Sequence, residues 1–262
     1  MANPSPEHPL ADQWPRLLAT VESGGVPALI AEIEKTEDRE TRRGLFSLSF
    51  GKLSREEWSG RSLDSTIEIG RATIAEGLRQ AESEEDPVEA GKRIDFANVV
   101  SYNLAADLAD CWPHDDRPRE TRHSEAGLAA AEDCLRWREE LGKGPFPFSI
   151  AYWAHGMHSL SLGQCAAATE SFEKSLAAAQ ELARGEHRAV EVGADATFGV
   201  NLGVGYLGLA RMRAGDPEGR AMFESALAGF SAQKAAHPEE ELDADFGISQ
   251  LATAEARTRS SS

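Results

Sequence analysis

The residues best suited to chemistry in this sequence are histidines and cysteines that form two close pairs. Cys111 and His114 lie in a polar segment, and His155 and His158 lie in a segment with helical character. Thiolate and imidazole groups are ligands that Zn²⁺ prefers. If the segments carrying the two pairs pack side by side, one cysteine and three histidines would suit a zinc site. The alternative is that they are ordinary surface or interhelical histidines and a small buried cysteine.

Motifs of common enzyme classes are missing from the sequence. The cluster Gly199, Gly203, Gly205 and Gly208 has spacing typical of helix packing, and no predicted strand precedes it, as a phosphate-binding loop would require. The Gly-x-Ser-x-Gly turn of many hydrolases is also absent. The sequence therefore predicts a protein that is not an enzyme and needs no cofactor, with zinc as the alternative.

Charge and composition exclude several classes of partner. The 262 residues include 27 Lys and Arg against 44 Asp and Glu, which gives a formal net charge of −17. Such an excess of acid disfavours nucleic acid and anionic membrane surfaces as partners. The N-terminus lacks the features of a secretory signal, and three widely spaced cysteines do not form a disulfide framework. We therefore expect a cytoplasmic protein.

Helical patterns dominate the chain and predict an all-α fold. Stretches rich in Ala, Leu, Glu, Arg and Gln carry apolar residues at three- and four-residue spacing, and no segment alternates as a strand would. The predicted helices lie near residues 10–22, 26–37, 39–53, 62–83, 87–111, 119–141, 148–162, 165–184, 188–214, 217–235 and 239–256.

A repeated helical hairpin is the most informative feature. Residues 172–176 read FEKSL, residues 223–227 read FESAL, and residues 131–135 read AEDCL, at offsets of 51 and 41. Each copy follows another predicted helix, and in two cases Gly163 or Gly215 lies at the turn between them. One such hairpin cannot bury its apolar face alone, so the hairpins are expected to stack.

On these residues the chain resembles the tetratricopeptide-repeat (TPR) family. Residues 149–182 match the family pattern best, the next copy matches less fully, and the copy at 97–141 has Ala131 in place of an aromatic residue. The matching residues of the best copy are Tyr152, Gly156, Gly163, Ala168, Phe172 and Ser175. In the next copy they are Leu207, Gly208, Gly215, Phe223 and Ala226. The resemblance implies antiparallel hairpins stacked into a right-handed superhelix, with small residues allowing close approach and Tyr152 in the core.

The same pattern suggests how the chain is divided. We expect a disordered lead-in at 1–9 and degenerate TPR-like hairpins at 10–85. TPR-like repeats should follow at 86–236, then a capping helix at 237–257 and a disordered tail at 258–262.

The resemblance also implies a function as a protein-interaction scaffold or adaptor. Its first helices would line a concave groove that binds a protein or peptide, neutral or basic given the charge. Candidate groove residues are Asn103 and Asn201, which would bond a peptide backbone, Trp153 as an aromatic anchor, and Arg211. The alternatives are that Trp153 belongs to the core and that the two asparagines are satisfied between helices.

Two other functions remain open at this point. One is a metal- or small-molecule-binding helical protein that uses Cys111, His114, His155 and His158. The other is an architectural protein that assembles into a homo-oligomer through its repeat ends.

Overall fold

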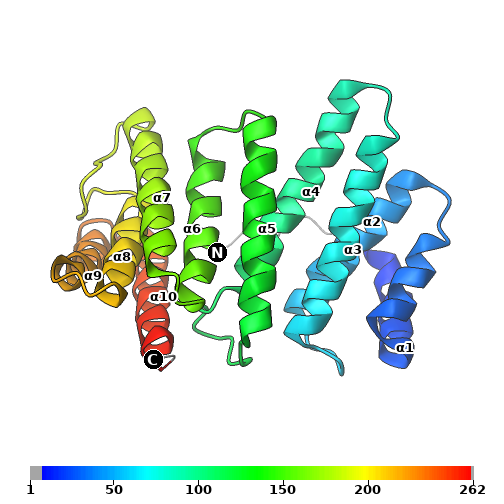
Figure 1. Cartoon of the computed structure of the whole chain (residues 1–262), viewed down its shortest axis with the longest axis horizontal. Coiled ribbons are helices and arrows are strands. Elements are labelled where there is room, and N and C mark those ends of the chain that lie inside the picture. The colour runs from blue at the N-terminus through cyan, green and yellow to red at the C-terminus, as the bar shows by residue number, and fades with distance from the viewer. Residues whose placement is uncertain (1–7, 261–262) are drawn as a thin grey trace. The chain divides into compact units, whose positions relative to one another are not determined.

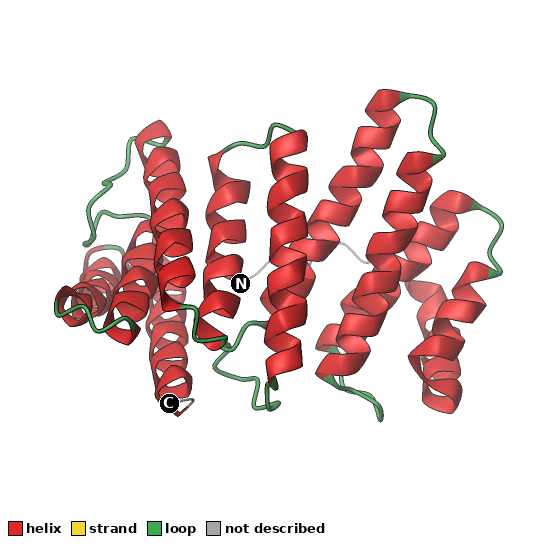
Figure 2. Cartoon of the chain, in the orientation of Figure 1, coloured by secondary structure: helices red, strands yellow, loops and turns green. Residues whose placement is uncertain are grey.

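Ten α-helices account for most of the described part of the chain. The structure is a computed structural model that describes residues 8–260, and within them only one isolated β-bridge interrupts the helices and loops (Figure 2). The all-α prediction is confirmed. The chain divides into two compact units, the first ending at Asp107 and the second beginning at Leu108. The predicted domain boundaries at 9–10, 85–86 and 236–237 stay predictions.

The first unit contains a kinked helix followed by three more. Gly25 breaks the first of them with a φ of 73°, a left-handed conformation that glycine adopts at little cost. This break separates the two segments that were predicted at 10–22 and 26–37. The helices of this unit are α1 (Trp14–Glu34), α2 (Arg39–Arg55), α3 (Leu63–Glu82) and α4 (Pro87–Leu108), preceded by a short 3₁₀ turn, Ala11–Gln13.

Six helices of the second unit pack as neighbours along the chain. Each contacts the helix that follows it, as expected for antiparallel hairpins (Figure 1). They are α5 (Thr121–Glu140), α6 (Pro145–Ser161), α7 (Cys165–Gly185), α8 (Phe198–Arg213), α9 (Glu218–Ala236) and α10 (Glu241–Ser260), with a 3₁₀ turn at Pro238–Glu240 before α10. Gly163 and Gly215 occupy the predicted turns with φ values of 73° and 81°.

Small residues bring the two helices of each hairpin into close contact. A Cβ added at Gly156 of α6 would lie 2.7 Å from the ring of Phe172 on α7. A Cβ at Gly208 of α8 would lie 2.6 Å from the backbone nitrogen of Phe223 on α9. Phe172 also stacks on Tyr206 of the next hairpin, with 5.4 Å between ring centroids. In both hairpins the glycine thus packs against the phenylalanine of the second helix, at the ring in one case and at the backbone in the other.

The predicted helix at 188–214 is wrong in its first ten residues. Residues 188–197 form a loop, with a single parallel bridge between Ala189 and Ala196, and α8 begins at Phe198. Thr197 caps the helix, because its side chain accepts a hydrogen bond from the backbone N–H of Val200. Gly193, with a φ of 155°, lets the loop turn back.

The last helix continues beyond the predicted limit of the capping helix. α10 extends to Ser260, so residues 258–260 of the predicted tail are helical. The rest of that tail, and residues 1–7 of the predicted lead-in, lie outside the described residues. Within residues 8–260, no helix combines the length and apolarity needed to cross a bilayer.

Candidate functional site

The four predicted zinc ligands do not meet. Cys111 is fully buried, and its Sγ lies 3.5 Å from Nε2 of Gln250, which donates to it. His114 is exposed in the loop before α5. Among the described residues, no three His, Cys, Asp or Glu side chains are placed to hold a metal ion. The structure therefore does not bring the four predicted ligands together as a metal site.

The two histidines of α6 serve the packing of helices instead. Nδ1 of His155 lies 2.8 Å from the Ser171 hydroxyl on α7, and burial lowers the pKa of the imidazole. His158 is 1% exposed and packs over Gly127 of α5, where an added Cβ would fall 2.2 Å from its ring. The two rings, three residues apart, therefore face different neighbouring helices.

Trp153 does not line an open groove, contrary to the groove prediction. Its side chain is buried, with ring centroids 5.8 Å from Trp112 and 6.0 Å from Tyr206. Its indole N–H lies near the Tyr206 hydroxyl but makes no hydrogen bond of good geometry. The alternative, that Trp153 is a core residue, is the one that the structure supports.

Asn201 is also buried, so it does not present its amide to a peptide. Its Oδ1 accepts from the N–H of Gly193 at 3.0 Å, and its Nδ2 donates to the carbonyl of the same residue at 3.1 Å. Nδ2 also donates to Oε1 of Gln233 on α9 at 3.2 Å. The Asn201 amide therefore makes hydrogen bonds with the backbone of the 188–197 loop that another backbone segment would otherwise make. It also holds this loop against the hairpin α8–α9.

The other two predicted groove residues differ in their surroundings. Arg211 lies near the end of α8, where its guanidinium pairs with Glu173 of α7 at 3.1 Å and lies 3.5 Å from Sδ of Met222. It therefore links neighbouring helices at the surface. Asn103 is half-buried on α4, and its part in partner binding stays a prediction.

An open groove lies instead over α6, between the end of α5 and the second half of α7. Its volume is about 600 Å³. The rings of Phe148 and Tyr152 stack along it with centroids 6.1 Å apart. Lys174 of α7 holds its Nζ 5.5 Å from the centroid of Tyr152, a cation–π geometry. We call this the Phe148–Tyr152 groove; its other lining residues are Glu139, Lys143, Gly144, Pro145, Ala177, Ala178 and Glu181.

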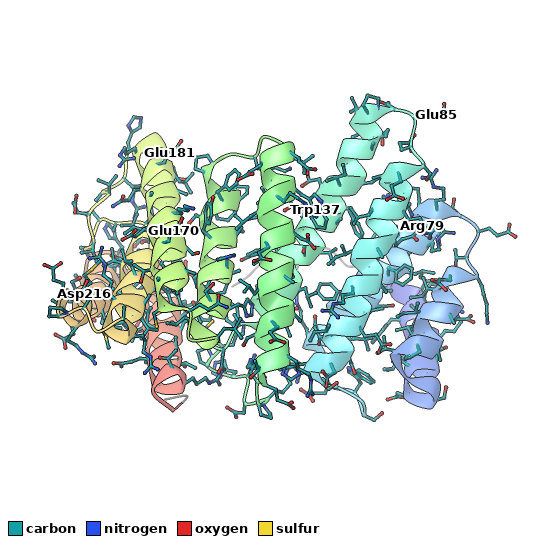
Figure 3. The ribbon with its side chains drawn as sticks, viewed as in Figure 1. Arg79, Glu85, Trp137, Glu170, Glu181 and Asp216 are labelled. Atoms are coloured by element: carbon teal, nitrogen blue, oxygen red, sulfur yellow. The ribbon has the colours of Figure 1, made fainter. Side chains whose placement is uncertain are left out.

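The groove combines an apolar stack with charges of both signs. Figure 3 places Glu181 near one end of α7 and Glu170 further along the same helix. The hydrogen bond from Lys174 to Glu170, at 2.7 Å, raises the pKa of the lysine and keeps it protonated. Such a groove can take a peptide side chain on the rings while the rim charges contact polar groups beside it.

The sequence contained a signal for this groove. Phe148 and Tyr152 are four residues apart, and this spacing puts two side chains on one face of a helix. The TPR-like pattern assigned Tyr152 to the core, and the structure shows it half-buried at the groove. Its neighbour Trp153 occupies the core position.

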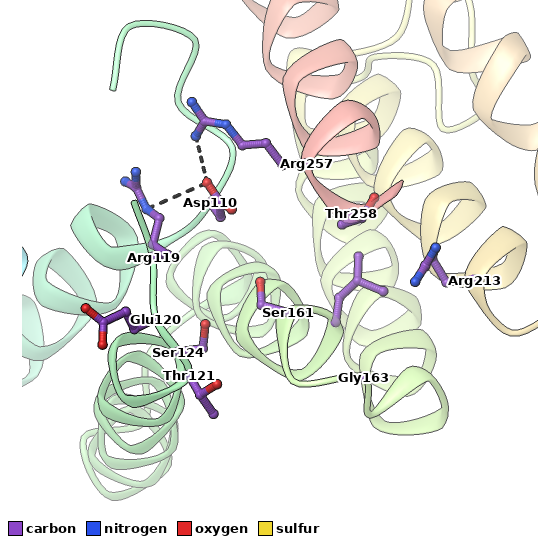
Figure 4. A pocket seen from close by; sticks show the side chains of 11 residues that line it. Asp110, Arg119, Glu120, Thr121, Ser124, Ser161, Gly163, Arg213, Arg257 and Thr258 are labelled. Atoms are coloured by element: carbon purple, nitrogen blue, oxygen red, sulfur yellow. Dashed lines mark hydrogen bonds and ion pairs between the residues drawn. The ribbon is translucent and has the colours of Figure 1, made fainter. Parts of the chain in front are cut away.

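A second cavity, of about 270 Å³, lies among helix ends of the second unit (Figure 4). Arg257 of α10 pairs with Asp110 at 2.7 Å, and Arg119 pairs with Asp115 at 2.7 Å. Burial by itself raises the pKa of Asp115, but hydrogen bonds from Arg117 and Arg119 lower it well below its ordinary value. These arginines already form ion pairs with carboxylates. The residues around the cavity therefore serve chiefly to hold the 109–120 segment against α10.

Comparison with known proteins adds no relative. No family model, curated protein or solved structure matches this chain.

Proposed function

We propose that this chain is a non-enzymatic protein-interaction scaffold of TPR-like hairpins that binds a neutral or basic peptide segment in the Phe148–Tyr152 groove. The observation that carries the proposal is the pair of stacked, half-buried rings on an open surface. Aromatic side chains that are partly buried before binding lose little conformational freedom on binding, and they dominate the energetics of many interfaces.

The repeat contacts support the TPR-like part of the proposal. Gly156 against Phe172 and Gly208 against Phe223 occupy equivalent places in two successive hairpins, and each hairpin turns on a left-handed glycine. Hairpins related in this way would stack with a constant rotation, and the expected outcome is a right-handed superhelix.

Charge supports a neutral or basic partner. The net charge is −17, and the groove rim carries Glu139 and Glu181 beside its two lysines. An acidic protein attracts basic segments over distances of about a Debye length, roughly 8 Å at physiological ionic strength, and this raises the association rate. A reducing cytoplasm is the compartment that we propose, since all three cysteines are free.

A peptide-display selection against the purified chain tests the proposal. We expect it to enrich peptides with an apolar or aromatic anchor beside Lys or Arg. Tyr152→Ala should weaken the enriched peptides by about tenfold or more, because it removes the surface on which the anchor stacks.

Val88→Ala is the matched control, because Val88 is a 65% exposed apolar residue on α4, outside the groove. It should bind as the unaltered chain does. Equal affinity in the Tyr152→Ala variant, or no enriched peptide at all, would reject the groove as the binding site.

A further inference from the structure

The last helix, α10, does more than cap the final hairpin. Its Leu251 lies on Gly205 of α8, where an added Cβ would come within 2.5 Å of the leucine. At its far end, Arg257 reaches Asp110 of the 109–120 segment, as Figure 4 shows. α10 therefore connects the last hairpin to a segment that precedes α5, and it covers the face formed between them.

An aromatic contact adds to this arrangement near the start of α10. Phe246 stacks on Trp112 and on Phe198, with centroid distances of 6.3 and 6.5 Å. Gly247 faces the ring of Phe230 on α9, where a Cβ would lie 2.5 Å from the ring. The face covered by α10 thus contacts the start of this helix with aromatic rings and its end with the carboxylate of Asp110.

Little apolar surface holds α10 in place. Its buried residues are mostly small or polar: Ala244, Gly247, Gln250, Leu251 and Ala254. By contrast, α9 fully buries two rings, Phe223 and Phe230. Because hydrophobic stabilisation grows with the apolar area removed from water, the buried side chains of α10 contribute less of it than those of α9.

Polar groups lie buried beneath α10. Gln250 donates to the thiol of Cys111, and the neighbouring hydroxyl of Tyr206 and indole N–H of Trp153 make no hydrogen bond of good geometry. Buried polar groups held in poor hydrogen-bond geometry stabilise the closed arrangement little, and water would solvate them once α10 moves away. The polar groups beneath α10 therefore add little to the stability of the interface.

We propose that the face beneath α10 is a helix-docking site and that α10 is its reversible, intramolecular occupant. α10 detaches as a rigid helix at residues 237–240, where Pro238 separates it from α9 and a single 3₁₀ turn joins the two. The rest of the second unit stays folded. This device is independent of the Phe148–Tyr152 groove, which lies on α5, α6 and α7.

The residues with which α10 contacts this face indicate what kind of partner helix could replace it. A competing helix carries an aromatic residue near its start, small residues along one face and a basic residue near its end. Acidic residues in its first half complement Lys234 of α9, which pairs with Asp245 and Glu241 of α10 at 2.8 and 2.9 Å. The partner class is thus an amphipathic protein helix with the charge order of α10.

Thiol labelling of the full chain reports whether α10 detaches. Cys111 contacts Gln250 of α10, whereas Cys134 lies on α5; both are 0% exposed, and burial raises the pKa of each to about 11. Global unfolding exposes both thiols together. We expect N-ethylmaleimide, with the modified residues located by mass spectrometry, to label Cys111 roughly tenfold or more faster than Cys134, because detachment of one helix costs less than global unfolding.

Variants of α10 sharpen this experiment. Arg257→Gln removes the ion pair with Asp110 and should speed labelling of Cys111 several-fold without changing Cys134. Leu242→Ala is the control, because Leu242 lies on the same helix with 82% exposure. Tyr152→Ala should leave both labelling rates unchanged, so failure of the peptide groove and failure of this device are distinguishable.

A synthetic peptide of residues 241–260 tests the docking site directly. Followed by fluorescence anisotropy, it should bind the Arg257→Gln chain more tightly than the unaltered chain, and a peptide carrying Leu251→Asp should bind neither. Equal labelling rates for Cys111 and Cys134 in every variant would overturn the proposal. Rapid labelling of Cys111 without binding of the peptide to any variant would overturn it as well.

Discussion

Single atoms decide how closely the hairpins of the second unit pack. Gly208 is the clearest case, because a Cβ there would lie 2.6 Å from a backbone nitrogen of α9 and could not be relieved by rotating a side chain. We expect Gly208→Ala to lower the free energy of unfolding by about 1–3 kcal/mol, as overpacking of a core does. Urea unfolding measures this change.

Gly199→Ala provides the matched control on the same helix. A Cβ at Gly199 would meet Ala179 at 3.5 Å, an ordinary van der Waals contact. Its effect should range from none to a stabilisation of up to about 1 kcal/mol, the helix propensity of Ala over Gly. A Gly208→Ala chain as stable as the Gly199→Ala chain would contradict the close-approach argument.

His155 gives the stability a predictable dependence on pH. Burial lowers its pKa below the ordinary value of 6.5; nearby Glu132 opposes this shift and Lys174 adds to it. Between the lowered pKa and 6.5 the unfolded chain binds more protons than the folded chain does. The free energy of unfolding should therefore fall as the pH drops through this window and recover above it.

The variant His155→Gln should lose this part of the pH dependence, because it keeps a hydrogen-bonding group near Ser171 without a titrating ring. His114→Gln, at an exposed position, should keep it. Urea unfolding on both sides of pH 6.5, the ordinary pKa of the imidazole, measures the difference. An unchanged pH profile in His155→Gln would show that other groups dominate.

Some segments keep their conformation because a side chain forms hydrogen bonds with their backbone. The loop at 188–197 is the clearest example. Asn201→Ala removes three hydrogen bonds, two to Gly193 and one to Gln233. We expect it to destabilise the chain by about 1–3 kcal/mol, because it leaves the partly buried N–H of Gly193 and the buried amide of Gln233 without this partner.

Hydrogen–deuterium exchange should locate that loss in residues 188–197, with faster exchange of the Gly193 amide. Ser231→Ala is the control, since Ser231 is exposed on α9 and its hydroxyl donates only within its own helix. Faster exchange spread evenly over the second unit would indicate a global effect instead of a loop held by one amide.

The same elements show what local sequence patterns could and could not predict. Spacing of apolar residues placed the helices, and glycines placed two turns, because both signals are local. The segment from 188 to 197 contains helix-compatible Ala and Glu, but its conformation depends on Asn201, which lies in the next helix. The sequence also did not reveal which face of α6 is buried. Phe148, Tyr152 and Trp153 place apolar residues around much of this helix.

At the scale of the whole molecule, the four proposed zinc ligands lie apart, and Trp153 and Asn201 are buried, for a shared reason. The zinc and groove predictions each assumed that particular faces of distant helices would meet or stay open. The contacts that decided the outcome join segments far apart in the chain, such as Gln250 to Cys111 and Phe246 to Trp112. No local period carries information about such pairs, whereas the all-α class, which rests only on local periods, was predictable.

The contact between Arg257 and Asp110 has a consequence for synthesis of the chain. A ribosome releases the 109–120 segment long before it releases α10, so each hairpin can form on the ribosome from contacts near in sequence while that segment waits. Trp112 and the Cys111 thiol then stay accessible to chaperones and oxidants until α10 has been synthesised. The second unit becomes complete only once α10 has left the ribosome, and a chain truncated before α10 would form hairpins without these long-range contacts.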